Sequence, residues 1–478
     1  MTKKGFVYLV GAGPGDEKLI TVKGLEALRQ AEVVLYDRLV NPLLLQEVDA
    51  NTELIYCGKL PDRHIVRQEN INELLVEKAK EGKLVVRLKG GDPGVFGRVG
   101  EEALALKQEN IGYEIVPGIT SGIAAAAYAG IPVTHREYGT SFTVITGHDK
   151  SSEGKPLINW QALAQGSDTI AFYMGVKNLP YICDNLVQNG KASDTKVAVI
   201  QWGTTSQQKV VEGTLDTIVG EVERHNISNP AITLVGNIVA LRKQLKWFED
   251  KPLFRRKIIF PNASSEQVAT LKNSGAEVLA YPRQYLVQML EQDTLRKVVT
   301  YEDILFTTKE SVSLFFEGLQ ALKIDIRLLK ASLYYTCEEI GRLLKQRGLF
   351  AEKSLSFTHQ LTVGTVQDEE LYQGDYLATH LMKNHEPVSV AFKRMVEENG
   401  FNTVIFSDVS SVKAFIEQVP KDGNDPFALM EQCQVICLTE EANQAAIHYQ
   451  IPVTNFEKNF SEVDLPQLLL QNVEIAII

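Results

Sequence analysis

A glycine-rich loop that contains a proline and an acid is the first candidate for a ligand site. The loop is GAGPGD, residues 11–16, and it follows the apolar run VYLV. A strand, such a turn and a helix can bind a pyrophosphate, and the dinucleotide fingerprint is G-x-G-x-x-G. Here Asp16 occupies the third glycine position, and Pro14 has no N–H to donate. A phosphate is therefore a poor guest, and a dinucleotide, a different adenosyl ligand and a purely structural turn all stay open.

Asp37 is a second candidate, because it ends the apolar run AEVVLYD. In dinucleotide-binding units an acidic residue at about this distance binds the ribose. This single observation favours a dinucleotide.

A second glycine-rich loop follows the run VVRLK and reads GGDP, residues 90–93. Its glycines let a ligand approach the backbone, and Asp92 offers a hydrogen-bond acceptor. A tight turn alone would explain this loop. It would not explain why the chain also contains PGITSGIAAAAYAGIPVTHR and FYMG.

The elements that position these loops indicate an α/β protein. Short β-rich runs such as SFTVITGH, KVAVIQWGT and PAITLVG alternate with helical stretches, and each ends in glycine or a polar residue. The chain has 478 residues, too many for one ordinary core. A charged stretch with Pro252, LKWFEDKPLFRRK, divides it into predicted domains 1–250 and 251–478.

Composition excludes several classes of protein. The residues are 44% hydrophobic and 23% charged, as in a soluble globular protein, and the net charge of −11 argues against a general nucleic-acid binder. The N-terminus predicts neither a signal peptide nor a membrane span. Five cysteines without a CxxC pair indicate reduced thiols in the cytoplasm and no metal site.

The second block contains an internal repeat. DILFTTKESVSLFFE starts at residue 303 and TVIFSDVSSVKAFIE at residue 403, and the two agree at five positions. Each is typical of a buried strand, a Thr, Ser or Asp turn able to cap, and a helix. Two strand–helix units of one sheet would explain the match, but we favour two similar α/β half-domains facing each other across a cleft.

The first block strongly resembles the uroporphyrinogen-III C-methyltransferases, which have the tetrapyrrole methylase fold of two α/β subdomains. The resemblance runs from about residue 5 to 248. It rests on an ordered set of motifs: VGAGPGD, LYDRLV, GK at 58–59, RLKGGDP, VPGITS, AGIPVTHR, TGH, YMGV, GTT with QKVVEGTL, and NPAITLVG.

This resemblance implies an S-adenosylmethionine pocket and an acid–base pair. The pair maps to Asp37 and Lys59, so the ribose-binding role of Asp37 is no longer needed. The donor carries a sulfonium but no phosphate, which suits the GAGPGD loop. The cofactor-binding positions implied by the family are Pro14, Gly90, Gly91, Asp92, Val95, Thr120, Ser121, Met174, Gly203 and Ala231.

The implied reaction is methylation of uroporphyrinogen III at two ring carbons to give precorrin-2, an intermediate toward sirohaem and cobalamin. Asp37 would accept a proton, and Lys59 would donate one or bind a propionate. Four arginines near the loops are candidate clamps for substrate carboxylates: Arg38, Arg63, Arg87 and Arg136. The chain departs from the family's usual GGDPF and GRGGEE at Gly94 and Val99, so the pocket wall is expected to differ.

The second block, from about residue 255, resembles uroporphyrinogen-III synthase more faintly. That family has two α/β half-domains and cyclises hydroxymethylbilane. The family's Gly-x-x-Thr turns are replaced here by Glu338–Glu339 and Glu440–Glu441, which would cap helices or repel a polycarboxylate. The alternative is an inactive docking or tetrapyrrole-binding module. The expected partners are a small-molecule tetrapyrrole and a second copy of the chain, bound through the methyltransferase domain, with no nucleic acid and no membrane.

Overall fold

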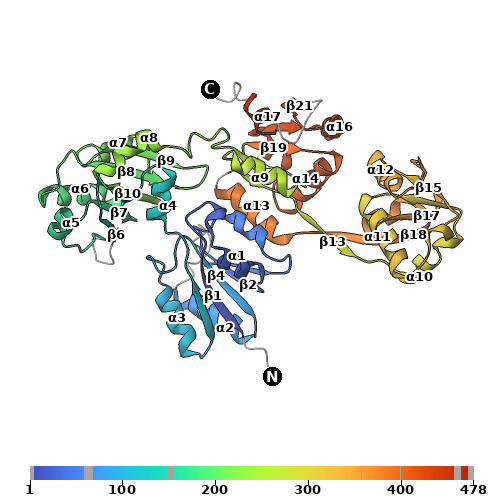
Figure 1. Ribbon diagram of the computed structural model, residues 1–478, viewed down its shortest axis with the longest axis horizontal. Helices are drawn as coiled ribbons and strands as arrows, with labels where there is room; N and C mark the ends of the chain where they lie inside the picture. Colours follow the sequence, from blue (N-terminus) through green and yellow to red (C-terminus); the bar gives the residue numbers. More distant parts are fainter. Residues whose placement is uncertain are drawn as a thin grey trace. The chain divides into compact units, whose positions relative to one another are not determined.

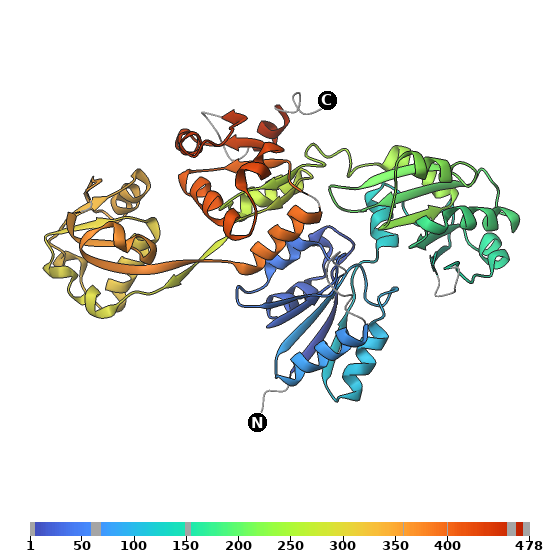
Figure 2. The ribbon, with the colours of Figure 1, turned by 180° about the vertical axis from the view of Figure 1, so that it is seen from behind.

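The computed structural model describes residues 5–58, 68–148, 154–356, 358–398, 400–456 and 465–471. Its chain forms two compact units, Met1–Pro282 with Glu386–Ile478, and Arg283–His385. Within the described ranges, four sheets alternate with helices (Figures 1 and 2). The α/β class expected from the sequence is confirmed. No helix among these residues is long and apolar enough to cross a membrane, and Cys57, Cys183, Cys337, Cys433 and Cys437 are free thiols.

The first sheet is parallel, with the strand order β3-β2-β4-β1-β5. Its strands are β1 (Phe6–Gly11), β2 (Val33–Tyr36), β3 (Glu53–Tyr56), β4 (Leu84–Lys89) and β5 (Gly112–Val116). Its helices are α1 (Val22–Arg29), α2 (Gln68–Lys80) and α3 (Val99–Gln108). Alternate side chains of β1 enter different cores, since Leu9 packs with α2 and α3 whereas Val10 packs with α1. The carboxyl ends of β1, β4 and β5 therefore meet at one edge, where the glycine-rich loops begin.

The second sheet is mixed, with the order β6-β7-β10-β8-β9. Only β6 and β7 are parallel among the described pairs. Its strands are β6 (Phe142–Thr146), β7 (Thr169–Tyr173), β8 (Lys196–Gln201), β9 (Lys209–Thr214) and β10 (Ala231–Val235). The accompanying helices are α4 (Ser121–Tyr128), α5 (Trp160–Gly166), α6 (Leu179–Gln188), α7 (Ile218–Arg224) and α8 (Arg242–Leu245).

The third sheet, also in the first unit, is parallel with the order β12-β11-β19-β20-β21. Its strands are β11 (Lys257–Ile259), β12 (Glu277–Leu279), β19 (Thr403–Phe406), β20 (Gln434–Cys437) and β21 (Asn455–Phe456). Its helices are α9 (Ser265–Asn273), α13 (Glu386–Glu398), α14 (Val409–Lys421), α15 (Pro426–Glu431), α16 (Glu440–His448) and α17 (Leu465–Gln471). One apolar cluster joins the first sheet and the short helix η2 (Pro42–Glu47) to α13. Compactness therefore does not divide the chain at residue 250, and that boundary stays a prediction.

The second unit holds the fourth sheet, with the order β13-β18-β17-β14-β15-β16. Its strands are β13 (Gln284–Gln288), β14 (Asp303–Phe306), β15 (Ser332–Tyr335), β16 (Ala351–Lys353), β17 (Thr358–Thr365) and β18 (Gln373–Asn384). Its helices are α10 (Gln292–Arg296), α11 (Lys309–Ala321) and α12 (Glu338–Gln346). The unit's first and last strands pair antiparallel, with Gln284 opposite Asn384. The His385 N–H donates to the Arg283 carbonyl at 2.9 Å, so the two ends of the unit lie together.

The internal repeat corresponds to β14–α11 and β19–α14, so the predicted strand, cap and helix are confirmed in both copies. Thr308 and Asp408 are the N-caps, and each forms a reciprocal capping box with the serine three residues later. The two copies belong to different sheets. This finding rules out two units of one sheet and agrees with two α/β halves.

Candidate active site

Two glycine-rich loops interlock where β1 and β4 end. Gly13 and Gly91 exchange backbone hydrogen bonds of 3.2 and 2.7 Å, and both have left-handed backbone conformations. A β-carbon added to Gly91 would meet only the Thr120 Cα, at 4.0 Å. Gly91 therefore leaves open space beside the start of α4, as a loop must if a ligand is to approach its backbone.

The carboxylate of Asp92 joins this pair of loops to a third. Its Oδ1 accepts the Gly94 N–H at 2.7 Å, and its Oδ2 accepts the Gly118 N–H at 2.9 Å. A β-carbon on Gly118 would collide with the Gly91 carbonyl. Asp92 thus holds the GGDP loop against the PGITS loop. The sequence predicted it as a hydrogen-bond acceptor, and the donors it accepts from are backbone N–H groups of these loops.

The start of α4 is held by a tyrosine from the second sheet. The Tyr173 hydroxyl shares a hydrogen bond of 2.6 Å with the Thr120 hydroxyl and accepts the Gly122 N–H at 2.5 Å. Ser121 is the first residue of α4. Met174 directly follows Tyr173, is 47% exposed and has a left-handed backbone conformation. Thr120 and Ser121 thus lie at the helix start that Tyr173 contacts, and Met174 is the residue after Tyr173; their role in binding a ligand stays a prediction.

The remaining predicted positions lie where the second sheet approaches the GAGPGD loop. The Asp16 N–H donates to the Thr204 hydroxyl at 3.0 Å, and a β-carbon on Gly15 would lie 3.0 Å from the Gly203 carbonyl. Ala231 starts β10 and pairs with Gln201, the last residue of β8. Of the predicted positions in this region, Pro14 and Gly203 are partly buried and Ala231 is buried.

Val95 and its neighbour Phe96 extend the GGDP loop toward a cavity whose lining residues mostly have apolar side chains. Val95 packs against the core cluster that contains Tyr173, and the rings of Phe96 and Tyr173 are 5.1 Å apart. Phe96 lines a cavity of about 450 Å³ together with Val144, Ile145, Thr146, Pro156, Leu157 and Ile158. This hollow beside the loop is a candidate for a ligand larger than a nucleoside.

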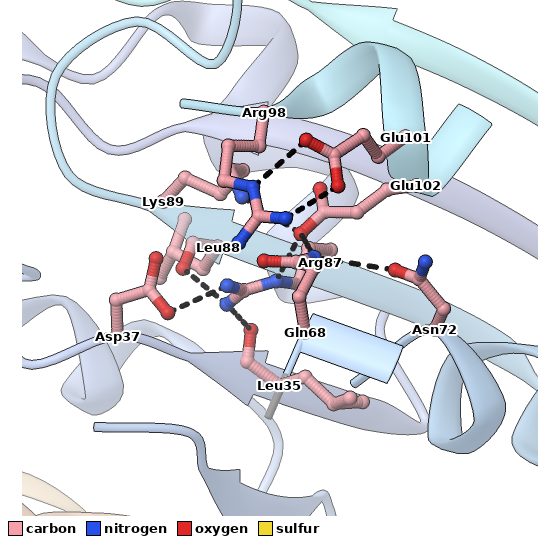
Figure 3. Close-up of polar contacts among 10 residues, drawn as sticks. All are labelled: Leu35, Asp37, Gln68, Asn72, Arg87, Leu88, Lys89, Arg98, Glu101 and Glu102. Atoms are coloured by element: carbon pink, nitrogen blue, oxygen red, sulfur yellow. Dashed lines mark hydrogen bonds and ion pairs between the residues drawn. The ribbon is translucent and has the colours of Figure 1, made fainter. Parts of the chain in front are cut away.

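A network of buried charges lies beside Asp37 (Figure 3). Asp37 follows β2, is 31% exposed, and accepts a hydrogen bond from Arg87 Nη2 at 2.5 Å. Arg87 Nε donates to Glu102 Oε1 at 3.1 Å. The same Glu102 oxygen accepts from Lys89 Nζ at 2.7 Å and from Gln68 Nε2 at 3.2 Å. Arg87 thus bridges a partly open carboxylate and a fully buried one.

Burial governs the electrostatics of this network. Desolvation lowers the pKa of Lys89, and the neighbouring Arg87 charge lowers it further against the opposing effect of Glu102. Desolvation acts against the charged form of Arg87 as well, but Asp37 and Glu102 outweigh it and raise the pKa of Arg87. Arg87 therefore stays charged and holds one side of Asp37 while the other side remains accessible.

The predicted arginine clamps differ in their exposure to solvent. Arg87 was expected to clamp substrate carboxylates, but this prediction is wrong because the side chain is 2% exposed and engaged by Asp37 and Glu102. Arg38 and Arg136 are exposed. Lys59 and Arg63 lie outside the described residues.

Sequence reasoning missed Glu102 and Lys89. The sequence does contain a signal for them. Arg87 and Lys89 are two residues apart on β4, so their side chains lie on the same face of the sheet. A buried charged face requires a partner of opposite sign, and the GEE turn at the start of α3 supplies it.

Comparisons of the sequence with known proteins point to one family. The model of the tetrapyrrole (corrin/porphyrin) methylases matches residues 7–219. Uroporphyrinogen-III C-methyltransferase of Bacillus subtilis (strain 168) is 43% identical over 451 residues, which cover 92% of this chain and 93% of that protein. The Priestia megaterium protein of the same name is 60% identical over 235 residues, which cover 49% of this chain and 98% of that protein.

A solved structure is similar to part of the chain. It is the uroporphyrin-III C-methyl transferase from Thermus thermophilus complexed with S-adenyl homocysteine. It is 36% identical, covers 49% of this chain and 99% of its own, and has a TM-score of 0.43.

Proposed function

Because the chain belongs to the uroporphyrinogen-III C-methyltransferase family, we propose that it transfers methyl groups from S-adenosylmethionine to two ring carbons of uroporphyrinogen III, giving precorrin-2. The observation that carries the proposal is the cradle of three interlocked glycine-rich loops at the carboxyl edge of the first sheet, with Asp37 beside it. Such an edge is the usual ligand site of open parallel sheets.

The loops fit the methyl donor better than they fit a dinucleotide. Pro14 removes a donor that a phosphate would need, and Gly91 leaves room next to Thr120. The donor supplies a methyl group on a positively charged sulfur. The loops hold it, orient it toward the ring carbon and exclude water, and such positioning accounts for most of the acceleration.

Asp37 acts as the proton acceptor. Its accessible side faces away from Arg87. When the ring carbon attacks the sulfonium methyl, the carbon–methyl bond forms, the sulfur–methyl bond breaks and the ring becomes cationic. A positioned carboxylate can then take a proton that the ring loses from another position. Arg87 keeps the carboxylate in one orientation, because a charged guanidinium donates to it from a buried site. Lys59 is the proposed acid, or the partner of a substrate propionate.

The tetrapyrrole occupies the side of the site bordered by Phe96 and its cavity. The exposed ring and the aliphatic lining offer apolar contact to the macrocycle. Its carboxylates require cations, for which Arg38 and Arg136 are exposed candidates. The reaction leads toward sirohaem or cobalamin.

For the second block we propose a role related to uroporphyrinogen-III synthase. The observation that favours it is the confirmed β14–α11 and β19–α14 repeat with a capped helix start in each half. Helix N-termini suit an anionic guest such as hydroxymethylbilane. The alternative is an inactive module that docks another protein or binds a tetrapyrrole. We also propose a homodimer through the methyltransferase domain and a cytoplasmic location.

One experiment tests both activities on the full chain. Uroporphyrinogen III with methyl-labelled S-adenosylmethionine should yield a product carrying two labelled methyl groups. Folded protein that binds the donor but transfers no label would contradict the methyltransferase. Hydroxymethylbilane alone should give the type III isomer if the second block is active. Only the type I isomer, which closes spontaneously, would favour the inactive module.

A further inference from the structure

A helix of the third sheet contacts the segment that follows Asp37. Arg394 of α13 donates from Nη2 to the Arg38 carbonyl at 2.9 Å and from Nη1 to the Val40 carbonyl at 3.4 Å. Both partners belong to the first unit, like Arg394 itself. On its own helix, Nη2 also pairs with Glu398 at 3.0 Å, and Nε donates to the same carboxylate at 3.2 Å.

The packing around Arg394 fixes the direction of its guanidinium. Its central carbon lies 5.4 Å from the ring centre of Tyr36 and 5.3 Å from that of Tyr56. These tyrosines end β2 and β3 and are opposite each other in the sheet. Arg394 is 7% exposed, so its bonds to the carbonyls are shielded from water and stronger than surface contacts. Desolvation raises the pKa of Tyr36 to about 12, so this ring stays neutral.

The segment held by Arg394 contacts two parts of the candidate site, Asp37 and the GGDP loop. The Val40 N–H donates to the Asp37 carbonyl at 3.2 Å and closes a turn directly after the proposed base. Within that turn, Leu39 lies against Gly90, where an added β-carbon would come within 2.9 Å of the Leu39 Cβ. A shift of residues 38–40 would therefore move both Asp37 and the GGDP loop.

We propose that Arg394 is a positioning residue for methyl transfer: from α13 it fixes the backbone of residues 38–40 and thereby the place of Asp37. This inference rests on the proposed function of Asp37. Arg87 holds the carboxylate from inside the first sheet, and Arg394 holds the main chain from outside it. The rate of the first block then depends on a correctly folded third sheet.

The test compares matched variants of the full chain by steady-state kinetics with uroporphyrinogen III and S-adenosylmethionine. Arg394→Met should lower kcat by roughly 10- to 100-fold with little change in either KM, because a small misplacement of a reacting group has costs of this size. Arg394→Lys should be intermediate, since an ammonium cannot span both carbonyls. The control is Lys393→Met, which removes only the 3.3 Å ion pair to Asp422 from the same helix and should keep the wild-type kcat.

Three results would overturn the positioning role. They are a wild-type kcat in folded Arg394→Met, an equal loss in Lys393→Met, or a rise in KM without a fall in kcat. If Arg394→Met does not fold, Arg394→Gln replaces it, and a wild-type kcat in that variant would be equally decisive. A wild-type chain that transfers no methyl group would instead contradict the proposed function itself.

Discussion

Charged side chains gather in two regions of this molecule under opposite conditions. The first region lies beside Asp37. There, the side chains of Arg87, Lys89 and Glu102 are between 0 and 6% exposed and are hydrogen-bonded in one network. At the start of α12, Glu338 and Glu339 form ion pairs of 3.4 and 3.5 Å with lysines, and all four side chains are at least 50% exposed. The same residue types therefore have different roles. A buried charge must keep its partner, whereas an exposed pair contributes little.

Removal of the buried carboxylate should have the largest effect on stability. Glu102→Gln should lower the free energy of unfolding by about 3–5 kcal/mol, because buried Lys89 then loses the carboxylate that it pairs with and Arg87 keeps only Asp37. The control is Glu101→Gln, since Glu101 is next in the chain but forms an exposed pair with Arg98 at 2.5 Å. Its effect should be less than about 1 kcal/mol. Urea unfolding of both variants measures the difference, and equal losses would contradict the distinction.

Asp37 lies at the edge of the buried network, where its carboxylate is partly exposed to solvent. Asp37→Asn should lower kcat by roughly 100-fold or more while the Kd for S-adenosylmethionine changes only a few-fold. The amide keeps the shape of the carboxylate but cannot accept the proton. Single-turnover assays with calorimetric measurement of donor binding separate the two quantities. Parallel losses in rate and binding would indicate a damaged pocket rather than a missing base.

Phe96 tests the apolar side of the same site. Phe96→Ala should raise the KM for uroporphyrinogen III by about 5- to 10-fold, corresponding to about 1 kcal/mol of lost aromatic contact, with the KM for S-adenosylmethionine unchanged. The variant also removes the contact with Tyr173, so its thermal stability has to be measured in parallel. An unchanged KM for the tetrapyrrole would place the substrate elsewhere.

The exposed glutamates should give the smallest change in stability. Glu338→Thr with Glu440→Thr should alter the free energy of unfolding by less than about 1 kcal/mol, since both lie in exposed first turns of helices. The informative readout is the isomer formed from hydroxymethylbilane. More type III product than in the wild-type chain would show that these carboxylates repel the substrate. The N-caps of these helices are Cys337 and Thr439, so an unchanged isomer ratio would leave the glutamates with only a favourable interaction with the helix dipole.

Local patterns explain which parts of the molecule were predictable. The glycine-rich loops, the strands before them and the capped helices at Thr308 and Asp408 follow from short stretches of sequence, and the structure confirms their geometry. The role of Arg87 was misjudged because an arginine beside a ligand loop has the same local sequence whether it is buried or exposed. Its burial is decided by Glu102, on a helix that begins ten residues after β4 ends.

Arg394 marks the limit of such reasoning. Its acceptors, the carbonyls of Arg38 and Val40, are more than 350 positions earlier in the chain. Carbonyl groups carry no side-chain identity, so no residue type signals the contact. The predicted domain boundary at 250 likewise follows from local composition, whereas the apolar cluster that joins η2 to α13 depends on the packing of distant segments.

The paired ends of the second unit have a consequence for how this chain can be rearranged. Gln284 lies opposite Asn384, and the backbone of His385 is hydrogen-bonded to that of Arg283. The residues between these points therefore begin and end at adjacent positions, as a domain inserted into a surface loop of another domain does. A variant in which a short glycine-rich turn replaces residues 284–384 should therefore still fold the third sheet, whose strands all lie outside this range. This shorter chain would keep α13 and the β19–α14 copy of the repeat, and it would lack the β14–α11 copy.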